Sequence, residues 1–210
     1  MIIKKVHILI ATLSLSTALF AQKADNSTFD EGVIINGIKW ATRNVDKPGT
    51  FAAKPEDAGM FYQWNCKIGW SATEPIINSN GGTIWDVVVS ESSKWKRAND
   101  PSPNGWRVPT KKELRTLLNT KKVNQEGGTE NGISGKRFTD KTTGNSIFLP
   151  AVGYRNYSDG ALYRVGEFGF YWSGTRDGIY SAYNVGFCSW DTGGGPFDCF
   201  SGLSLRSVAE

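Results

Sequence analysis

The sequence of 210 residues has little sulfur and almost no imidazole, with three cysteines and one histidine. The histidine, His7, lies in an N-terminal segment that resembles an export signal, so the processed chain is expected to lack imidazole. This excludes Ser-His-Asp and Cys-His catalytic units and zinc sites that use histidine. Cys66, Cys188 and Cys199 form no C-x-x-C pair. We therefore expect no metal and no cofactor.

The chain also lacks a strong excess of charge of either sign. It has 24 Lys and Arg against 20 Asp and Glu, and removal of Lys4 and Lys5 with the leader leaves 22 against 20. This balance gives no electrostatic reason to expect nucleic acid or an anionic membrane as the main partner. Beyond the leader, no apolar run is long enough to span a bilayer, so no transmembrane span is expected in the mature chain.

Residues 1–21 are typical of a signal peptide. Lys4 and Lys5 precede an apolar stretch, and Ala21 stands where a signal peptidase could cut. No cysteine lies near this position, which disfavours a lipid anchor. The mature chain is expected to begin near Gln22 and to be secreted, periplasmic or at the cell surface. Residues 22–31 are polar and unpatterned, and we predict a tether followed by one domain over 32–210.

The domain is predicted to be β-rich, with antiparallel hairpins. Its 24 glycines and 12% aromatic residues suit short strands joined by turns. Asn36-Gly37 is a strong hairpin signal. Further strands are indicated over 59–65, 136–138, 147–149, 152–155, 161–164, 169–173, 180–187 and 202–208, the last by its alternating pattern.

One helix is predicted over about 111–119. Thr110 and Glu113 have the spacing of a capping box, and Leu114, Leu117 and Leu118 follow at the spacing of a buried helical face. The preceding stretch, 66–105, has little periodicity but contains three tryptophans, at 70, 85 and 95. Because so many tryptophans favour burial, we expect a long, ordered loop that folds back onto the domain.

Six sequence blocks occur in an order that resembles a known family. They are Trp-Ala-Thr-Arg-Asn-Val (40–45), Tyr-Gln-Trp-Asn (62–65), Asn-Gly-Trp-Arg-Val-Pro-Thr (104–110), Leu-Pro-Ala-Val-Gly-Tyr-Arg (149–155), Tyr-Trp-Ser-Gly-Thr (171–175) and Gly-Leu-Ser-Leu-Arg-Ser-Val (202–208). Together they resemble the Fibrobacter succinogenes major paralogous domain, common in secreted proteins of Bacteroides-type bacteria. The resemblance implies a surface or secreted role and an α+β, β-rich, C-type lectin-like single domain.

Two serines depart from the pattern of this family. Members of the family often carry one cysteine before the Gly-Trp-Arg block and another near the C-terminus. Here Ser102 and Ser207 stand at these places, so the disulfide of the family is absent.

A different disulfide can be argued from the residues. If Gly193-Gly194 is the turn of a hairpin, Cys188 and Cys199 face each other, and an oxidising compartment would join them. The alternative is two free thiols, because glycine-rich turns permit register slips. Cys66 is then left over as a buried, small hydrophobic residue.

Three classes of function remain. In the first, favoured one, the chain is a non-catalytic binding or adhesion module for a glycan or a protein, with Trp190, Asp191, Asp198 and Tyr171 as ligand-binding candidates. Trp172, in contrast, is expected in the core. The second class is an enzyme on a lectin-like scaffold, either similar to formylglycine-generating enzymes or a glycan hydrolase that uses carboxylates. The third is a structural part of a surface assembly.

Overall fold

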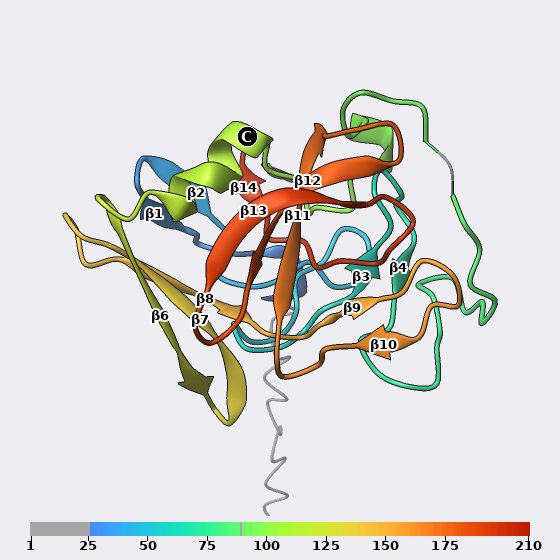
Figure 1. Ribbon diagram of the computed structural model, residues 1–210, viewed down its shortest axis with the longest axis horizontal. Coiled ribbons are helices and arrows are strands. Elements are labelled where there is room, and N and C mark those ends of the chain that lie inside the picture. Colours follow the sequence, from blue (N-terminus) through green and yellow to red (C-terminus); the bar gives the residue numbers. More distant parts are fainter. Residues whose placement is uncertain (1–25, 89) are drawn as a thin grey trace, which may run out of the picture.

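The computed structural model describes residues 26–88 and 90–210, and the predicted leader lies outside these residues. Paired strands are antiparallel and form three larger sheets and two short ribbons (Figure 1), which confirms the β-rich α+β class. Within residues 26–88 and 90–210, no helix is long and apolar enough to cross a membrane.

The first sheet brings the two ends of the domain together. It has the strand order β1 (Val33–Ile35), β2 (Ile38–Trp40), β14 (Val208–Ala209) and β5 (Trp106–Arg107). The turn between β1 and β2 is the predicted one, because Asn36 and Gly37 both have positive φ angles, of 47° and 80°. Val208 pairs with Trp40 on one side and with Arg107 on the other, so the last strand closes the fold.

The predicted helix begins where the capping box places it. The Thr110 hydroxyl accepts from the Glu113 backbone N–H (3.3 Å), and the Glu113 carboxylate accepts from the Thr110 N–H (2.8 Å). The α-helical part, α1 (Lys111–Leu114), is only one turn long and continues as the 3-10 helix η3 (Arg115–Leu118). The Thr116 hydroxyl donates to the Glu113 carbonyl oxygen (2.6 Å), which competes with continued α-helical bonding.

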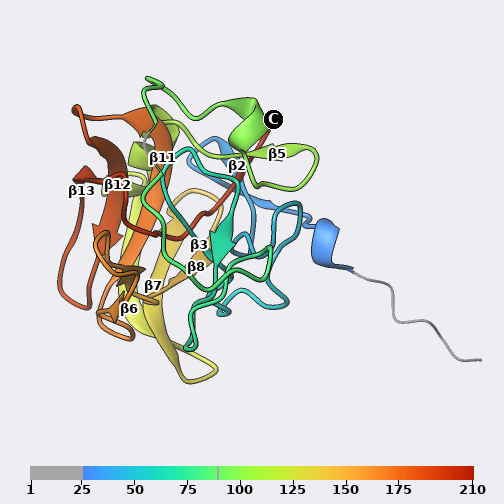
Figure 2. The same ribbon diagram turned by 90° about the vertical axis from the view of Figure 1, so that its right-hand side faces the viewer.

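A second sheet follows the helix, with the order β6 (Val123–Glu130), β7 (Ile133–Asp140) and β8 (Ser146–Pro150). The third sheet has the order β11 (Gly169–Arg176), β12 (Ser181–Phe187) and β13 (Thr192–Asp198). Figure 2 shows that this third sheet forms one side of the molecule, with β5 on the opposite side. The short elements are η1 (Asn26–Thr28), η2 (Arg97–Asn99) and the ribbons β3 (Phe61–Tyr62) with β4 (Gly69–Trp70) and β9 (Tyr154–Arg155) with β10 (Leu162–Tyr163).

The long loop is ordered, as predicted from its tryptophans, over its described residues. Trp70 and Trp95 are buried. Trp85 packs against Trp70 with ring centroids 4.9 Å apart, and its Nε1 donates to the Tyr157 carbonyl oxygen (3.0 Å). These contacts hold the loop against β9 and β10.

One residue of the predicted tether is fixed to the domain: the buried Asp30 carboxylate accepts from the N–H groups of Gly32 and Thr42 and pairs with Arg43. The prediction for residues 202–208 is wrong. Residues 202–208 do not form an exposed-and-buried alternating strand. All of them are buried, because the segment runs between Tyr62 and Trp172 and hydrogen-bonds the backbone on both sides.

Candidate functional site

The third sheet carries a strip without side chains. Residues paired across an antiparallel sheet point to the same face, so Gly193 shares a face with Gly186 and Phe170, and Gly195 shares it with Asn184. A Cβ atom built on Gly193 or Gly195 meets nothing within 4 Å. The backbone is therefore bare and accessible from this face.

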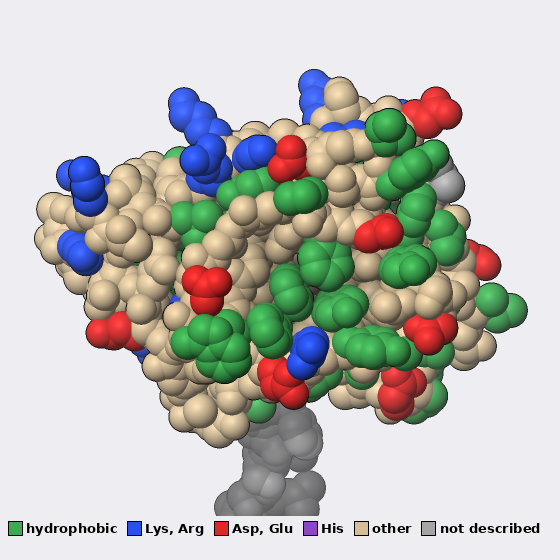
Figure 3. Space-filling model, in the orientation of Figure 1, with side chains coloured by type: hydrophobic (Ala, Val, Ile, Leu, Met, Phe, Trp, Pro, Cys, Tyr) green, Lys and Arg blue, Asp and Glu red, His purple; other side chains and the backbone are tan. Residues whose placement is uncertain are grey.

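Aromatic rings stand beside this strip and line an open cavity of about 280 Å³. Phe168 and Phe170 are stacked, with centroids 5.7 Å apart and ring planes within 2°, and Phe170 contacts Phe197 at 5.0 Å. Figure 3 shows hydrophobic side chains gathered over this part of the molecule, where Figure 1 places β11 and the ribbon of β9 and β10. We call the cavity the glycine-floored groove. Its floor is backbone, and its walls are phenyl rings.

The predicted turn at Gly193-Gly194 is wrong. β12 and β13 pair with Phe187 opposite Thr192 and with Ser181 opposite Asp198, so the turn comprises residues 188–191 and the glycines lie inside β13. Gly194 has a reason of its own, because its Cβ would lie 1.9 Å from the Tyr183 hydroxyl on the other face. Gly193 and Gly195 thus leave one face of the sheet open, and Gly194 leaves room for Tyr183 on the other face.

A wider cavity of about 890 Å³ adjoins the groove, and Phe168, Phe187 and Cys188 line both. Trp190, one of the predicted ligand-binding residues, lies at its edge with 82% of its surface exposed. The Arg164 guanidinium lies over the Phe168 ring at 5.5 Å and pairs with Glu167 (3.0 Å). Aromatic surface and charged groups therefore meet at this end.

Lys136 of the neighbouring sheet fixes the turn that carries Trp190 and Asp191. Lys136 of β7 is only 4% exposed, and its ammonium donates to the Asp191 carbonyl oxygen (3.0 Å) and to the Thr192 hydroxyl (2.7 Å). Burial lowers the pKa of Lys136 below its ordinary value. These bonds fix the turn before any ligand arrives, which reduces the ordering cost of binding.

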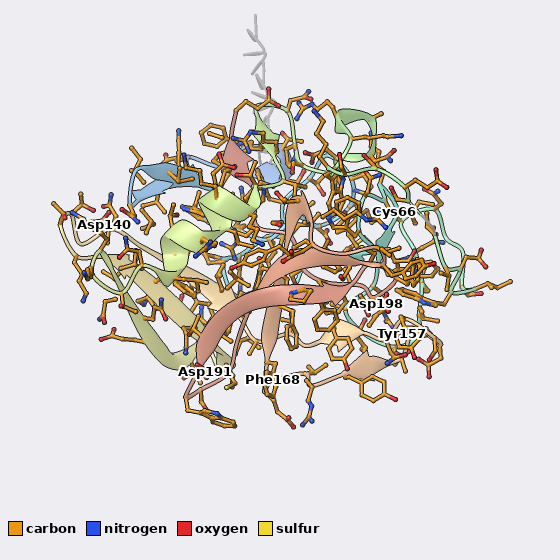
Figure 4. The ribbon with its side chains drawn as sticks, turned by 45° about the horizontal axis from the view of Figure 1, so that its top comes forward. Cys66, Asp140, Tyr157, Phe168, Asp191 and Asp198 are labelled. Carbon is orange, nitrogen blue, oxygen red and sulfur yellow. The ribbon has the colours of Figure 1, made fainter. Side chains whose placement is uncertain are left out.

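The predicted ligand residues do not all come together. Figure 4 shows Asp191 and Phe168 near one end of β13 and Asp198 at the other end. The two aspartates are seven positions apart along the extended chain, which corresponds to roughly 23 Å. Asp198 accepts from the Phe200 N–H (2.8 Å) and lines a separate cavity of about 480 Å³ beside Tyr180. Of the four predicted ligand-binding residues, only Asp191 lines the glycine-floored groove, and only Trp190 lines the adjoining cavity.

Tyr171 is a wrong candidate, because it is fully buried. Its hydroxyl donates to the Pro150 carbonyl oxygen (2.9 Å) and accepts from Asn44 (3.4 Å), and burial raises its pKa to about 12. Arg206 lies beside it and donates to Asn44 and to two backbone carbonyls. Tyr171 thus belongs to a buried polar network. Trp172 is buried, as predicted.

The predicted Cys188–Cys199 disulfide is also wrong. Cys188 lies in the turn opposite Asp191, whereas the Cys199 N–H donates to Tyr180 at the far end of the hairpin. Along the ladder this is a separation of about 25 Å, far beyond the reach of a disulfide. All three cysteines are free and buried, which agrees with the prediction for Cys66.

Phe168, Phe170 and Asn184 were not among the predicted site residues. The Asn184 amide donates to the Gly195 carbonyl oxygen (2.9 Å) at the floor of the groove. Their common signal is glycine at positions 186, 193 and 195, which share one face of the sheet, but it becomes readable only once the register is known.

In comparisons with known proteins, no family model, no curated protein and no solved structure matches this chain. Among residues 26–88 and 90–210, no three Asp, Glu, Cys or His side chains cluster as metal ligands would. What the groove binds is therefore inferred from its own residues.

Proposed function

We propose that the protein is a secreted or cell-surface, non-catalytic binding module whose glycine-floored groove takes a carbohydrate chain. The observation that carries this proposal is the combination of a bare backbone floor at Gly193 and Gly195 with the phenyl walls of Phe168, Phe170 and Phe197. A thin, flat ligand fits such a groove better than a bulky side chain.

The chemistry of the groove suits a sugar. Aromatic faces pack against the apolar C–H faces of sugar rings, and hydroxyl groups need hydrogen-bond partners beside them. The Asp191 carboxylate and the Asn184 amide line the groove, and the Arg164–Glu167 pair lines the adjoining cavity. Trp190, exposed at the open end, offers a further stacking surface.

The family resemblance enters this proposal as well. Membership of the Fibrobacter succinogenes major paralogous domain family, with a C-type lectin-like fold, agrees with an antiparallel β-rich domain that has one short α-helix and a long ordered loop. Ser102 and Ser207, which stand where the family has cysteines, contact each other through their hydroxyl groups (2.7 Å). The signal-like residues 1–21 support export.

A non-catalytic role is favoured over a glycan hydrolase by the positions of the two predicted carboxylates. Glycosidases place their carboxyl pair about 5 to 9.5 Å apart, whereas Asp191 and Asp198 stand at opposite ends of β13. These two residues cannot form such a pair with each other.

The test is a glycan array probed with the chain that lacks residues 1–21, with and without EDTA. We expect selective binding to a glycan and about a ten-fold loss of affinity in Trp190→Ala, which corresponds to about 1.4 kcal/mol. Gly195→Val should also abolish binding, because the new side chain fills the open space above the floor.

Tyr157→Ala is the matched control, because Tyr157 is an exposed aromatic residue that does not line the groove. Its affinity should equal that of the wild type. Binding to proteins alone, or equal affinities for wild type, Trp190→Ala and Gly195→Val, would contradict the carbohydrate proposal. Release of reducing ends from a bound glycan would contradict its non-catalytic part.

A further inference from the structure

Another cavity, of about 610 Å³, lies beside α1 and η3 and shares no lining residue with the glycine-floored groove. Lys111, Lys112 and Arg115 line it, with Thr175 of β11 and Asn119 after η3. Figure 3 shows Lys and Arg side chains gathered along the upper edge of the molecule, where Figure 1 places these helices. We call it the basic cavity.

The positive charge of the basic cavity is only partly neutralised. The Lys111 ammonium pairs with Asp177 (3.0 Å) and lies over the Tyr183 ring at 4.6 Å. Lys112 and Arg115 make no side-chain hydrogen bond or ion pair with the residues that the structure describes. The nearby Glu113 carboxylate is directed to Arg107, which binds both of its oxygens (2.8 and 2.6 Å).

The two uncompensated cations are positioned to act together. Lys112 and Arg115 are three residues apart on a continuous helical segment, so they lie on one side of it. A guanidinium fork binds carboxylate, sulfate or phosphate through two parallel hydrogen bonds, and an ammonium adds a point charge. The Thr175 hydroxyl accepts from the Lys111 N–H (3.0 Å), which leaves its own O–H to donate to a ligand.

We propose that the basic cavity binds the acidic groups of an anionic polysaccharide, at a site separate from the glycine-floored groove. A polysaccharide fits better than nucleic acid, because the chain without its leader has only 22 basic against 20 acidic residues, and tight binding to DNA requires many phosphate contacts. Lys112 and Arg115, which have no ion pair with the described residues, line an open cavity and suit a sparsely charged polymer.

The experiment compares binding of sulfated dextran, polygalacturonic acid and neutral dextran of similar length at physiological ionic strength. We expect the wild type to bind one or both acidic polymers through this cavity. Neutral dextran should not bind there. Lys112→Gln with Arg115→Gln should weaken this binding about ten-fold, since two charge-assisted contacts are lost.

Lys121→Gln with Lys122→Gln is the matched control, because it removes the same charge outside the cavity. Its affinity should fall less than about three-fold, as expected for a screened, long-range effect. Equal losses in the two double variants, absence of binding to both acidic polymers, or tighter binding of a single-stranded DNA oligonucleotide through Lys112 and Arg115 would overturn the proposal. Lys112→Gln with Arg115→Gln should bind the neutral glycan found on the array as tightly as the wild type does, so failure here is distinguishable from failure of the groove.

Discussion

The hydroxyl oxygens of Ser102 and Ser207 lie 2.7 Å apart, although the residues are 105 positions apart in the chain. Ser207 is fully buried, and its carbonyl oxygen accepts from the Ala41 N–H (2.9 Å). The pair therefore links the loop before β5 to the segment that leads into β14.

A disulfide should form at this position when both serines are replaced. Ser102→Cys with Ser207→Cys would close a loop of more than 100 residues, for which chain entropy gives about 4.7 kcal/mol, and engineered disulfides commonly deliver less. We expect the free energy of unfolding to rise by about 2–4 kcal/mol. Thermal unfolding with and without reductant measures this, with Ser102→Cys alone as the control. Five titratable thiols in the denatured, unreduced double variant, instead of the three of the wild type, would contradict the prediction.

The three glycines of β13 should respond differently to a side chain. Gly193→Val and Gly195→Val place the new atoms in open space, so the free energy of unfolding should stay the same or rise by about 0.5–1 kcal/mol. Gly194→Ala would bring Cβ within 1.9 Å of the Tyr183 hydroxyl and should destabilise the fold by about 1–3 kcal/mol. Denaturant unfolding of the three variants decides this, and equal effects would refute the assigned faces.

Stability should depend on the ionisation of Glu113. The hydrogen bonds from Arg107 lower the pKa of Glu113 from 4.5 to about 2. Its contribution is therefore complete above about pH 4.5 and is lost as the pH falls toward 2. Glu113→Gln keeps an acceptor for Thr110 but removes the charge, and should cost about 1–2 kcal/mol at neutral pH, after allowance for solvent screening of the partly exposed pair.

The pH dependence supplies the check on Glu113. The difference between wild type and Glu113→Gln should shrink as denaturation curves are recorded at decreasing pH across this window. Glu167→Gln is a suitable control, because its ion pair with Arg164 is about 60% exposed and should contribute little. A constant difference at every pH would show that the charge of Glu113 is not the cause.

Three thiols should titrate in guanidinium without reductant, since no disulfide joins the cysteines. In the folded protein Cys66 and Cys199 should react slowly, because burial raises the pKa of both thiols, that of Cys199 to about 11, and the thiolate is the reactive form. Alkylation followed by peptide mass spectrometry measures each rate. A single thiol per denatured chain would contradict the free cysteines.

Local features could be predicted from the sequence because they depend on residues a few positions apart. The turn at Asn36-Gly37 requires two positive φ angles, which these residues adopt readily. The capping box needs only Thr110 and Glu113, and the burial of Trp172 follows from a large apolar side chain in a strand.

The tertiary structure alone decided the register of β12 and β13, and with it the site. Gly193-Gly194-Gly195 is compatible with either a turn or a strand, and local preference does not choose between them. The choice is made by Tyr183, Val185 and Phe187, which must all face the core, and a one-residue slip would turn them to the other face. That register separates Cys188 from Cys199 and creates the groove. Burial of Tyr171 has the same origin, because Tyr171 is paired with Val185 and faces the core with it. The meeting of Ser102 with Ser207 requires the whole fold between them.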